Sequence, residues 1–136
     1  MKNINEYNKI EINNTRLNSW KVSDNLNKSF NFAFKGIKYA FNTQRNFKIQ
    51  VFTAAFAISY ALIFRIDVIK IAIIIIAITI VLSLELINTS LESAVDLSIG
   101  KEFHPLAKIA KDCAAGAVLI ASISSIFLAL IVLLSP

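Results

Sequence analysis

The chain ends in a long apolar run, and this run is the strongest constraint on its fold. Residues 113–134 are 22 consecutive residues without a charged side chain. A helix of about 20 apolar residues crosses the roughly 30 Å of hydrocarbon in a bilayer. Residues 68–91 are also long enough, although Lys70 and Glu85 lie among them, and residues 47–64 are marginal. With 56% hydrophobic residues overall, the composition indicates an all-α integral membrane protein with three transmembrane helices.

The segments before these runs differ from them in composition. Residues 1–26 hold seven asparagines and no sustained apolar period, which predicts a disordered tail. The tail lacks the apolar core of a signal peptide, so we expect it to stay uncleaved in the cytoplasm. Residues 27–136 form the predicted membrane-embedded domain. Its spans are expected at about 47–64, 68–97 and 105–134, the last starting at the helix-initiating Pro105.

Residues 27–45 have the pattern of an amphipathic helix. Four large apolar side chains recur at helical spacing and basic side chains fall on another face: Phe30, Phe34, Ile37 and Phe41 against Lys28, Lys35, Lys38 and Arg45. Such a helix suits the surface of an anionic leaflet, and we expect the chain to bend from it into the first span. A nucleic-acid surface is the competing interpretation, and we expect no nucleic acid because the rest of the chain requires a bilayer.

The basic residues predict the orientation of the spans. Nine of the fourteen Lys and Arg residues lie in residues 1–50, and three more lie between residues 97 and 112. By the positive-inside rule, the N-terminus and the second connection face the cytoplasm of a multi-pass protein in the inner (plasma) membrane. One cysteine and one histidine exclude an internal disulfide and a Cys/His zinc site. Three glycines cannot form a glycine-rich phosphate loop, so any ATP site must be built from side chains.

The residues that carry chemistry lie where the second span reaches the cytoplasmic boundary. Glu85, Asn88, Glu92 and Asp96 fall within about 80° of arc on one helical face. Stacked carboxylates near lipid are costly unless a cation or a proton offsets them, and Mg²⁺ is the obvious cation. The third span brings Lys111, a point charge suited to phosphate, and Asp112 to the same level. Alternatively the outer groups are ordinary boundary charges, and only Glu85, within apolar sequence, needs a function.

Two segments resemble a known family. ELINTSLESAVD (residues 85–96) and HPLAKIAKDCAAGAVLI (residues 104–120) are similar to the signature of the small bacterial diacylglycerol kinases, a family that includes undecaprenol kinases. The resemblance runs from about Phe30 to the end and includes FAFKGIKYAF and TQRNFKIQ. It implies a surface helix and three membrane helices in a homotrimer. It also implies transfer of the γ-phosphoryl group of MgATP to a lipid hydroxyl.

The resemblance also implies roles for individual residues. Glu85 would be the general base toward the lipid hydroxyl and Glu92 a metal ligand. The remaining nucleotide and metal site would be completed by Asn88, Asp96, Lys111 and Asp112. Gln44 stands where the family commonly has a second metal-binding glutamate, so we expect an active protein with a raised Mg²⁺ requirement. Gln50 likewise replaces a family carboxylate.

These observations give a leading function and three alternatives. The first candidate is phosphorylation of diacylglycerol to phosphatidate, and the second is phosphorylation of undecaprenol. A catalytically silent membrane scaffold and a small ion-conducting oligomer are the alternatives of other classes. The sequence does not choose the lipid acceptor, because lipid selectivity depends on the shape between helices.

Overall fold

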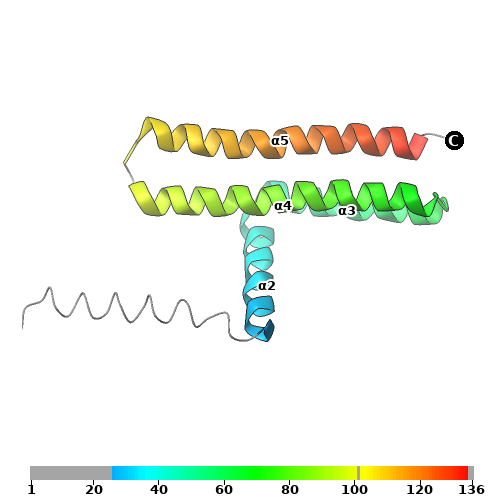
Figure 1. Cartoon of the computed structure of the whole chain (residues 1–136), viewed down its shortest axis with the longest axis horizontal. Helices are drawn as coiled ribbons and strands as arrows, with labels where there is room; N and C mark the ends of the chain where they lie inside the picture. The colour runs from blue at the N-terminus through cyan, green and yellow to red at the C-terminus, as the bar shows by residue number, and fades with distance from the viewer. Residues whose placement is uncertain (1–25, 101, 135–136) are drawn as a thin grey trace, which may run out of the picture. The chain divides into compact units, whose positions relative to one another are not determined.

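The computed structural model describes residues 26–100 and 102–134, and four helices account for most of them (Figure 1). In chain order they are α2 (Leu26–Thr43), α3 (Arg45–Ile63), α4 (Val68–Ile99) and α5 (Pro105–Leu134). The described residues contain no β-strand, and the predicted all-α class is confirmed. Apart from Leu26, the tail predicted over residues 1–26 lies outside the described residues.

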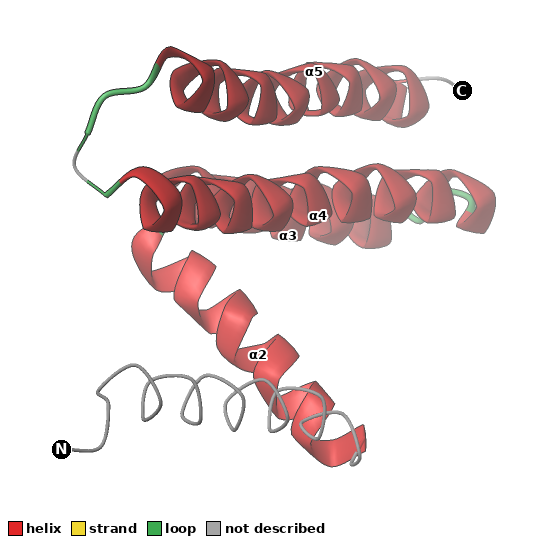
Figure 2. Ribbon diagram, turned by 60° about the vertical axis from the view of Figure 1, so that its left-hand side comes forward, coloured by secondary structure: helices red, strands yellow, loops and turns green. Residues whose placement is uncertain are grey.

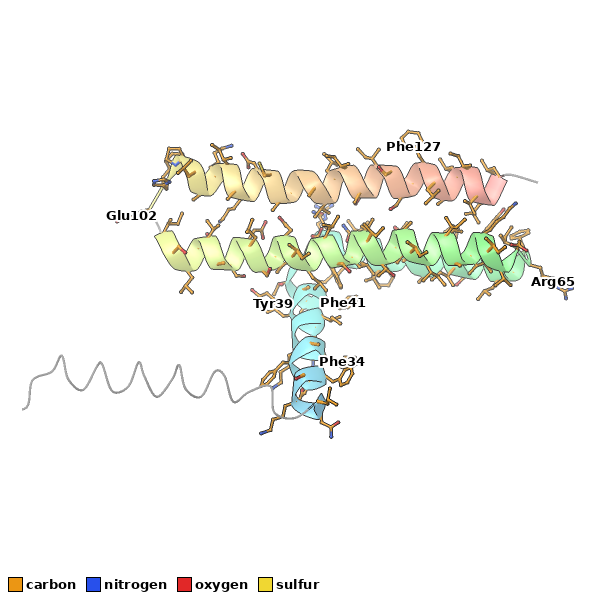
Figure 3. All side chains as sticks on the ribbon, viewed as in Figure 1. Phe34, Tyr39, Phe41, Arg65, Glu102 and Phe127 are labelled. Atoms are coloured by element: carbon orange, nitrogen blue, oxygen red, sulfur yellow. The ribbon has the colours of Figure 1, made fainter. Side chains whose placement is uncertain are left out.

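Three of these helices are long and apolar enough to span a membrane. They are α3, α4 and α5, with 19, 32 and 30 residues and mean hydropathies of 1.3, 2.6 and 2.8 over their most apolar windows. Many of their large apolar side chains are exposed, as Figure 3 shows for Phe127 on the side of α5 away from α4. A surface of this kind is stable against lipid rather than water. The chain is therefore a membrane protein.

Helix α2 has the predicted amphipathic composition, and its first part forms a unit of its own that ends at Lys38. Its aromatic side chains are exposed, with Phe30 and Phe34 at 64% and 70%. The Lys35 ammonium lies 5.5 Å from the centre of the Phe32 ring, within the range of a cation–π contact. Exposed rings beside lysines suit a boundary between acyl chains and phosphates.

The junction between α2 and α3 falls earlier than the sequence indicates. Helix α2 ends at Thr43 rather than at residue 45, and α3 begins at Arg45 rather than at residue 47. Gln44 separates them with an extended backbone, at φ −95° and ψ 115°. No glycine or proline marks this break, so only the backbone shows its position.

The connection from α3 to α4 is short and is closed by local hydrogen bonds. Asp67 caps α4, because its Oδ1 accepts a hydrogen bond of 2.8 Å from the amide of Ile69. Arg65, labelled at this turn in Figure 3, has a positive φ of 51°. The turn is stabilised by the Ile66 amide, which donates to the Ala61 carbonyl at 2.9 Å.

The connection from α4 to α5 is set by a glycine and a proline. Helix α4 ends at Ile99, two residues beyond the predicted end, and Gly100 follows at φ 61° and ψ −120°. A side chain disfavours this conformation, and glycine permits it. Helix α5 begins at Pro105, where the sequence places its start. His104 Nδ1 accepts a hydrogen bond of 3.2 Å from the Leu106 amide, which gives this residue a capping role.

Helix α4 is the central element of the unit that begins at Tyr39, since it contacts both α3 and α5 (Figures 1 and 2). Its neighbours in the chain both run antiparallel to it because the connections are short. Ile74, Ala77 and Val81 are buried at successive turns of α4, and Ala61 of α3 and Val118 of α5 are buried as well. Further toward the C-terminus of α4, the buried residues are polar: Glu85, Asn88 and Thr89.

Candidate active site

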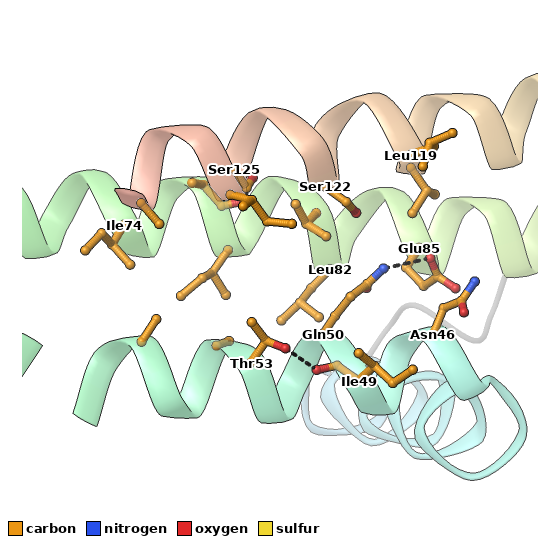
Figure 4. A pocket seen from close by; sticks show the side chains of 18 of the residues that line it. Asn46, Ile49, Gln50, Thr53, Ile74, Leu82, Glu85, Leu119, Ser122 and Ser125 are labelled. Carbon is orange, nitrogen blue, oxygen red and sulfur yellow. Dashed lines mark hydrogen bonds between the residues drawn. The ribbon is translucent and has the colours of Figure 1, made fainter. Parts of the chain in front are cut away.

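A cavity of about 430 Å³ lies among α3, α4 and α5 and is polar at one end (Figure 4). Most of its lining is apolar, with Ile74, Val81 and Leu82 from α4 and Leu119 and Ile126 from α5. Four polar residues from α3 and α4 line the other end: Asn46, Gln50, Glu85 and Asn88. The cavity thus joins an apolar space to a small polar group of side chains.

Glu85 is the most deeply buried of the predicted site residues, with 2% of its surface exposed. Its Oε2 accepts a hydrogen bond of 3.1 Å from Gln50 Nε2 on α3, a contact marked in Figure 4. Helical spacing on α4 turns Glu85 toward the same side as Val81 and Asn88, which also line the cavity. A carboxylate with one neutral donor and an open cavity beside it can accept a proton from a hydroxyl that enters.

Asn88 lies one turn further along α4 than Glu85 and bonds to the half-buried Glu92, one turn further still. Its Nδ2 donates to Glu92 Oε1 at 3.2 Å. Asn88 Oδ1 and Gln50 Oε1 are both buried, and neither has a hydrogen-bond partner among the residues that the structure describes. Two unpaired carbonyl oxygens beside one carboxylate are unusual in a folded interior and are typical of functional sites.

Asp96 and Lys111 meet at the end of α4 that leads to α5. Lys111 Nζ forms an ion pair with Asp96 Oδ1, and both side chains are partly exposed, at 34% and 58%. Asp112 is paired instead with Lys108, one turn earlier on α5 and well exposed. Lys108, Lys111 and Asp112 line a second, smaller cavity of about 220 Å³ with His104. The ammonium groups of Lys108 and Lys111 therefore lie at a small cavity near the C-terminus of α4 and the N-terminus of α5.

Gln44 is half-buried at the junction of α2 and α3, and its side chain does not cap α3. It does not line the cavity that holds Glu85 and Asn88. In the described part of the chain, no group of three or more His, Cys, Asp or Glu side chains is close enough to hold a metal ion. The single chain therefore does not bring Gln44 together with a cluster of acidic ligands.

The acidic face of α4 is continuous, but its members have different partners. Glu85 bonds to α3, Glu92 to Asn88 on the same helix, and Asp96 to α5. Asn46 and Gln50, which lie one turn apart on α3 and line the polar end with Glu85, were not predicted as site residues. Two amides at helical spacing within an apolar span were the signal that could have indicated them.

Comparisons with known proteins show the family to which the chain belongs. Residues 31–133 match the family model described as prokaryotic diacylglycerol kinase. The chain belongs to that family. A diacylglycerol kinase of Synechocystis sp. is 48% identical over 121 residues, which cover 89% of this chain and 69% of the relative. The undecaprenol kinase of Bacillus subtilis is 39% identical over 107 residues, covering 79% and 86% of the two chains. A diacylglycerol kinase of Helicobacter pylori is 39% identical over 95 residues, covering 70% and 73%.

Membership of the prokaryotic diacylglycerol kinase family confirms the resemblance drawn from residues 85–96 and 104–120, both of which lie inside the matched range. The chain is thus a lipid kinase, and the matched range includes Gln44, at the junction of α2 and α3, and Gln50, in α3.

Proposed function

We propose that this chain phosphorylates diacylglycerol, with MgATP as the phosphoryl donor and phosphatidate and ADP as the products. The observation that carries this proposal is Glu85, a buried carboxylate at the polar end of an apolar cavity in a chain of the diacylglycerol kinase family. A lipid acceptor needs an apolar space for its chains and a base at its hydroxyl. These two requirements coincide in the cavity.

Glu85 acts as the general base. The acceptor hydroxyl gives its proton to the Glu85 carboxylate while its oxygen forms a bond to the γ-phosphorus. The bond from that phosphorus to the β–γ bridging oxygen breaks, and ADP leaves with the electron pair. Phosphoryl transfer of this kind needs mainly alignment and compensation of charge, so one base and a few cationic or metal contacts suffice.

The oxygen atoms near Glu92 fit a magnesium ion that arrives with ATP. Magnesium usually takes one or two protein carboxylates together with substrate phosphates rather than a full protein cage. Glu92 supplies a carboxylate, and the buried, unpaired Asn88 Oδ1 is an amide oxygen beside it. Gln44 does not line the cavity within one chain, and we propose it as the second ligand, through its amide oxygen, only because the family resemblance implies a ligand at its position. When bound, the ion compensates the negative charge of the phosphates.

Lys111 is the proposed contact to the nucleotide phosphates, supported by Asp96 and Asp112. Its ion pair with Asp96 is partly exposed, and such pairs contribute little to folding stability. Exchange of Asp96 for a phosphate oxygen is therefore inexpensive. Asn88 completes the nucleotide-binding set at the boundary between the cavity and Glu92.

The bilayer and the other copies of the chain provide the remaining environment. We propose a multi-pass protein of the inner (plasma) membrane, with the N-terminus and active site cytoplasmic, as the basic residues of 1–50 favour. We propose that several copies of the chain associate, because three helices with so much exposed apolar surface enclose little interior. The number of three copies, a homotrimer, is what the family resemblance implies.

Undecaprenol is the second candidate acceptor, and the 39% identical undecaprenol kinase of Bacillus subtilis favours it. The test is transfer from radiolabelled ATP in lipid–detergent micelles with either diacylglycerol or undecaprenol at saturating Mg²⁺. We expect the greater kcat/KM with diacylglycerol. A greater value with undecaprenol would reverse the assignment, and no transfer to either lipid would leave the scaffold and ion-conducting interpretations.

Replacement of Glu85 tests the base directly. We expect Glu85→Gln to lower kcat about 100- to 10,000-fold, because the amide cannot take the proton. The matched control is Asp67→Asn, the same change at the opposite, exposed end of α4, where asparagine keeps the helix cap. A Glu85→Gln variant with wild-type kcat would contradict the role of this residue.

A further inference from the structure

Gln50 donates a hydrogen bond to Glu85, the proposed base. The proposed reaction does not itself require a group at position 50. We propose that Gln50 is a positioning residue, whose amide holds the Glu85 carboxylate by Oε2 and leaves Oε1 to take the proton of the acceptor hydroxyl. The inference rests on the proposed function, in which Glu85 is the base. It concerns an α3 amide that lines the same cavity as Glu85.

The contact fixes which way the amide points. An ionised carboxylate only accepts hydrogen bonds, so Nε2 and not Oε1 of Gln50 must face Glu85. The Nε2–Oε2 distance is 3.1 Å, and among the described residues no side chain donates to Glu85 Oε1. One carboxylate oxygen is therefore held and the other is left for the substrate.

A neutral donor suits this task better than a charged one. With 2% of its surface exposed, Glu85 has little water to hold it in one orientation. A lysine or arginine at position 50 would fix the carboxylate by cancelling its charge, which would oppose proton uptake. The amide of Gln50 restrains the group and adds no formal charge.

The alternative is that Gln50 only satisfies a buried carboxylate for the sake of stability. Its own carbonyl argues against this. Gln50 Oε1 is buried without a donor in the described part of the chain, and an unpaired buried carbonyl costs folding free energy. The side chain thus gains one hydrogen bond and loses another. An arrangement of this kind contributes little to stability and requires another reason.

The first test is Gln50→Met, which keeps the length of the side chain and removes the donor. We expect kcat to fall about tenfold to a hundredfold, the range for a hydrogen bond to a charged group, while KM for ATP and for diacylglycerol changes less than about twofold. Gln50→Asn, whose amide is one methylene shorter, should lower kcat as well. The control is Thr79→Val, which removes an exposed α4 hydroxyl that bonds only to the Ile75 carbonyl.

A double variant separates positioning from general damage. If Gln50 acts through Glu85, then Gln50→Met in a Glu85→Gln background should cause no further loss of kcat. An equal loss in both backgrounds, or a wild-type kcat in folded Gln50→Met, would overturn the inference. Circular dichroism and elution volume establish folding, and Gln50→Asn decides where Gln50→Met does not fold. An inactive wild-type protein would instead refute the proposed function.

Discussion

At the scale of single residues, the site depends on the cost of keeping Glu85 away from water. Burial of a carboxylate with one neutral hydrogen bond is unfavourable, and it persists only where another requirement outweighs it. The neighbours Gln50 and Asn88 each add an unpaired carbonyl oxygen to that cost. Three unfavourable groups at one end of one cavity are evidence for a site that substrate completes. Removal of these groups should therefore affect activity more than stability.

Gln44 gives the second residue-scale prediction. The amide offers Mg²⁺ an oxygen without negative charge, so Gln44→Glu should lower the Mg²⁺ concentration for half-maximal rate, by severalfold to about tenfold. The measurement is the initial rate at saturating ATP and lipid across a Mg²⁺ titration. Asn42→Asp is the matched control, because it adds the same charge two residues earlier on an exposed position. An unchanged titration for Gln44→Glu, or an equal shift for Asn42→Asp, would show that Gln44 is not a ligand.

At the scale of the elements, α4 is longer than a bilayer requires. Its 32 residues extend about 48 Å at 1.5 Å per residue, against about 30 Å of hydrocarbon. The helix is therefore several turns longer than the hydrocarbon requires, and Asp96, exposed and paired with Lys111, lies in its last turns. The buried Glu85 and the exposed Asp96 belong to one helix but to two environments. The same helix can thus present a base to a lipid and a polar end to a nucleotide.

The sequence predicts the ends of α4 and α5 better than the contacts between helices. Pro105 is a local signal, and α5 begins there as predicted. Helix α4 begins at the predicted residue 68 and ends at Ile99, two residues beyond its predicted end. The break at Gln44 has no such signal, so its position depends on packing that the sequence pattern does not contain. The contact of Gln50 with Glu85 joins residues 35 positions apart. It depends on the register of α3 against α4, which no short motif encodes.

Gly100 gives the element-scale prediction. Its φ of 61° is unfavourable for a residue with a Cβ, and an added Cβ would meet no other atom within 4 Å. Gly100→Ala should therefore lower the free energy of unfolding by about 1–3 kcal/mol, because of backbone strain and not because of a steric clash with a neighbouring residue. Gly36→Ala is the control, because Gly36 lies inside α2 and also has open space around it, so alanine should be neutral or stabilising. Unfolding by titration with a denaturing detergent measures both. Equal stability of the two variants would contradict a specific strain at Gly100.

At the scale of the whole molecule, one chain leaves most of its apolar surface uncovered. Of the most apolar windows of α3, α4 and α5, only 11%, 22% and 11% of the residues are buried. Lipid can cover such a surface, but acyl chains offer no hydrogen-bonding partner to the polar end of the cavity that holds Glu85. A neighbouring chain can do so. Assembly and catalysis should therefore be linked in this protein.

This link gives the last prediction. In micelles at a high ratio of protein to detergent we expect a protein mass three times the 15.1 kDa of one chain, together with full activity. Dilution of the protein with excess detergent should lower both mass and activity per chain over the same range, since association depends on the concentration of chains within the micelle phase. Light scattering and the radiolabel assay on the same samples measure the two quantities. Activity that stays constant while the mass falls to that of one chain would mean that the site works within a single copy, and Glu85 would then need no partner chain.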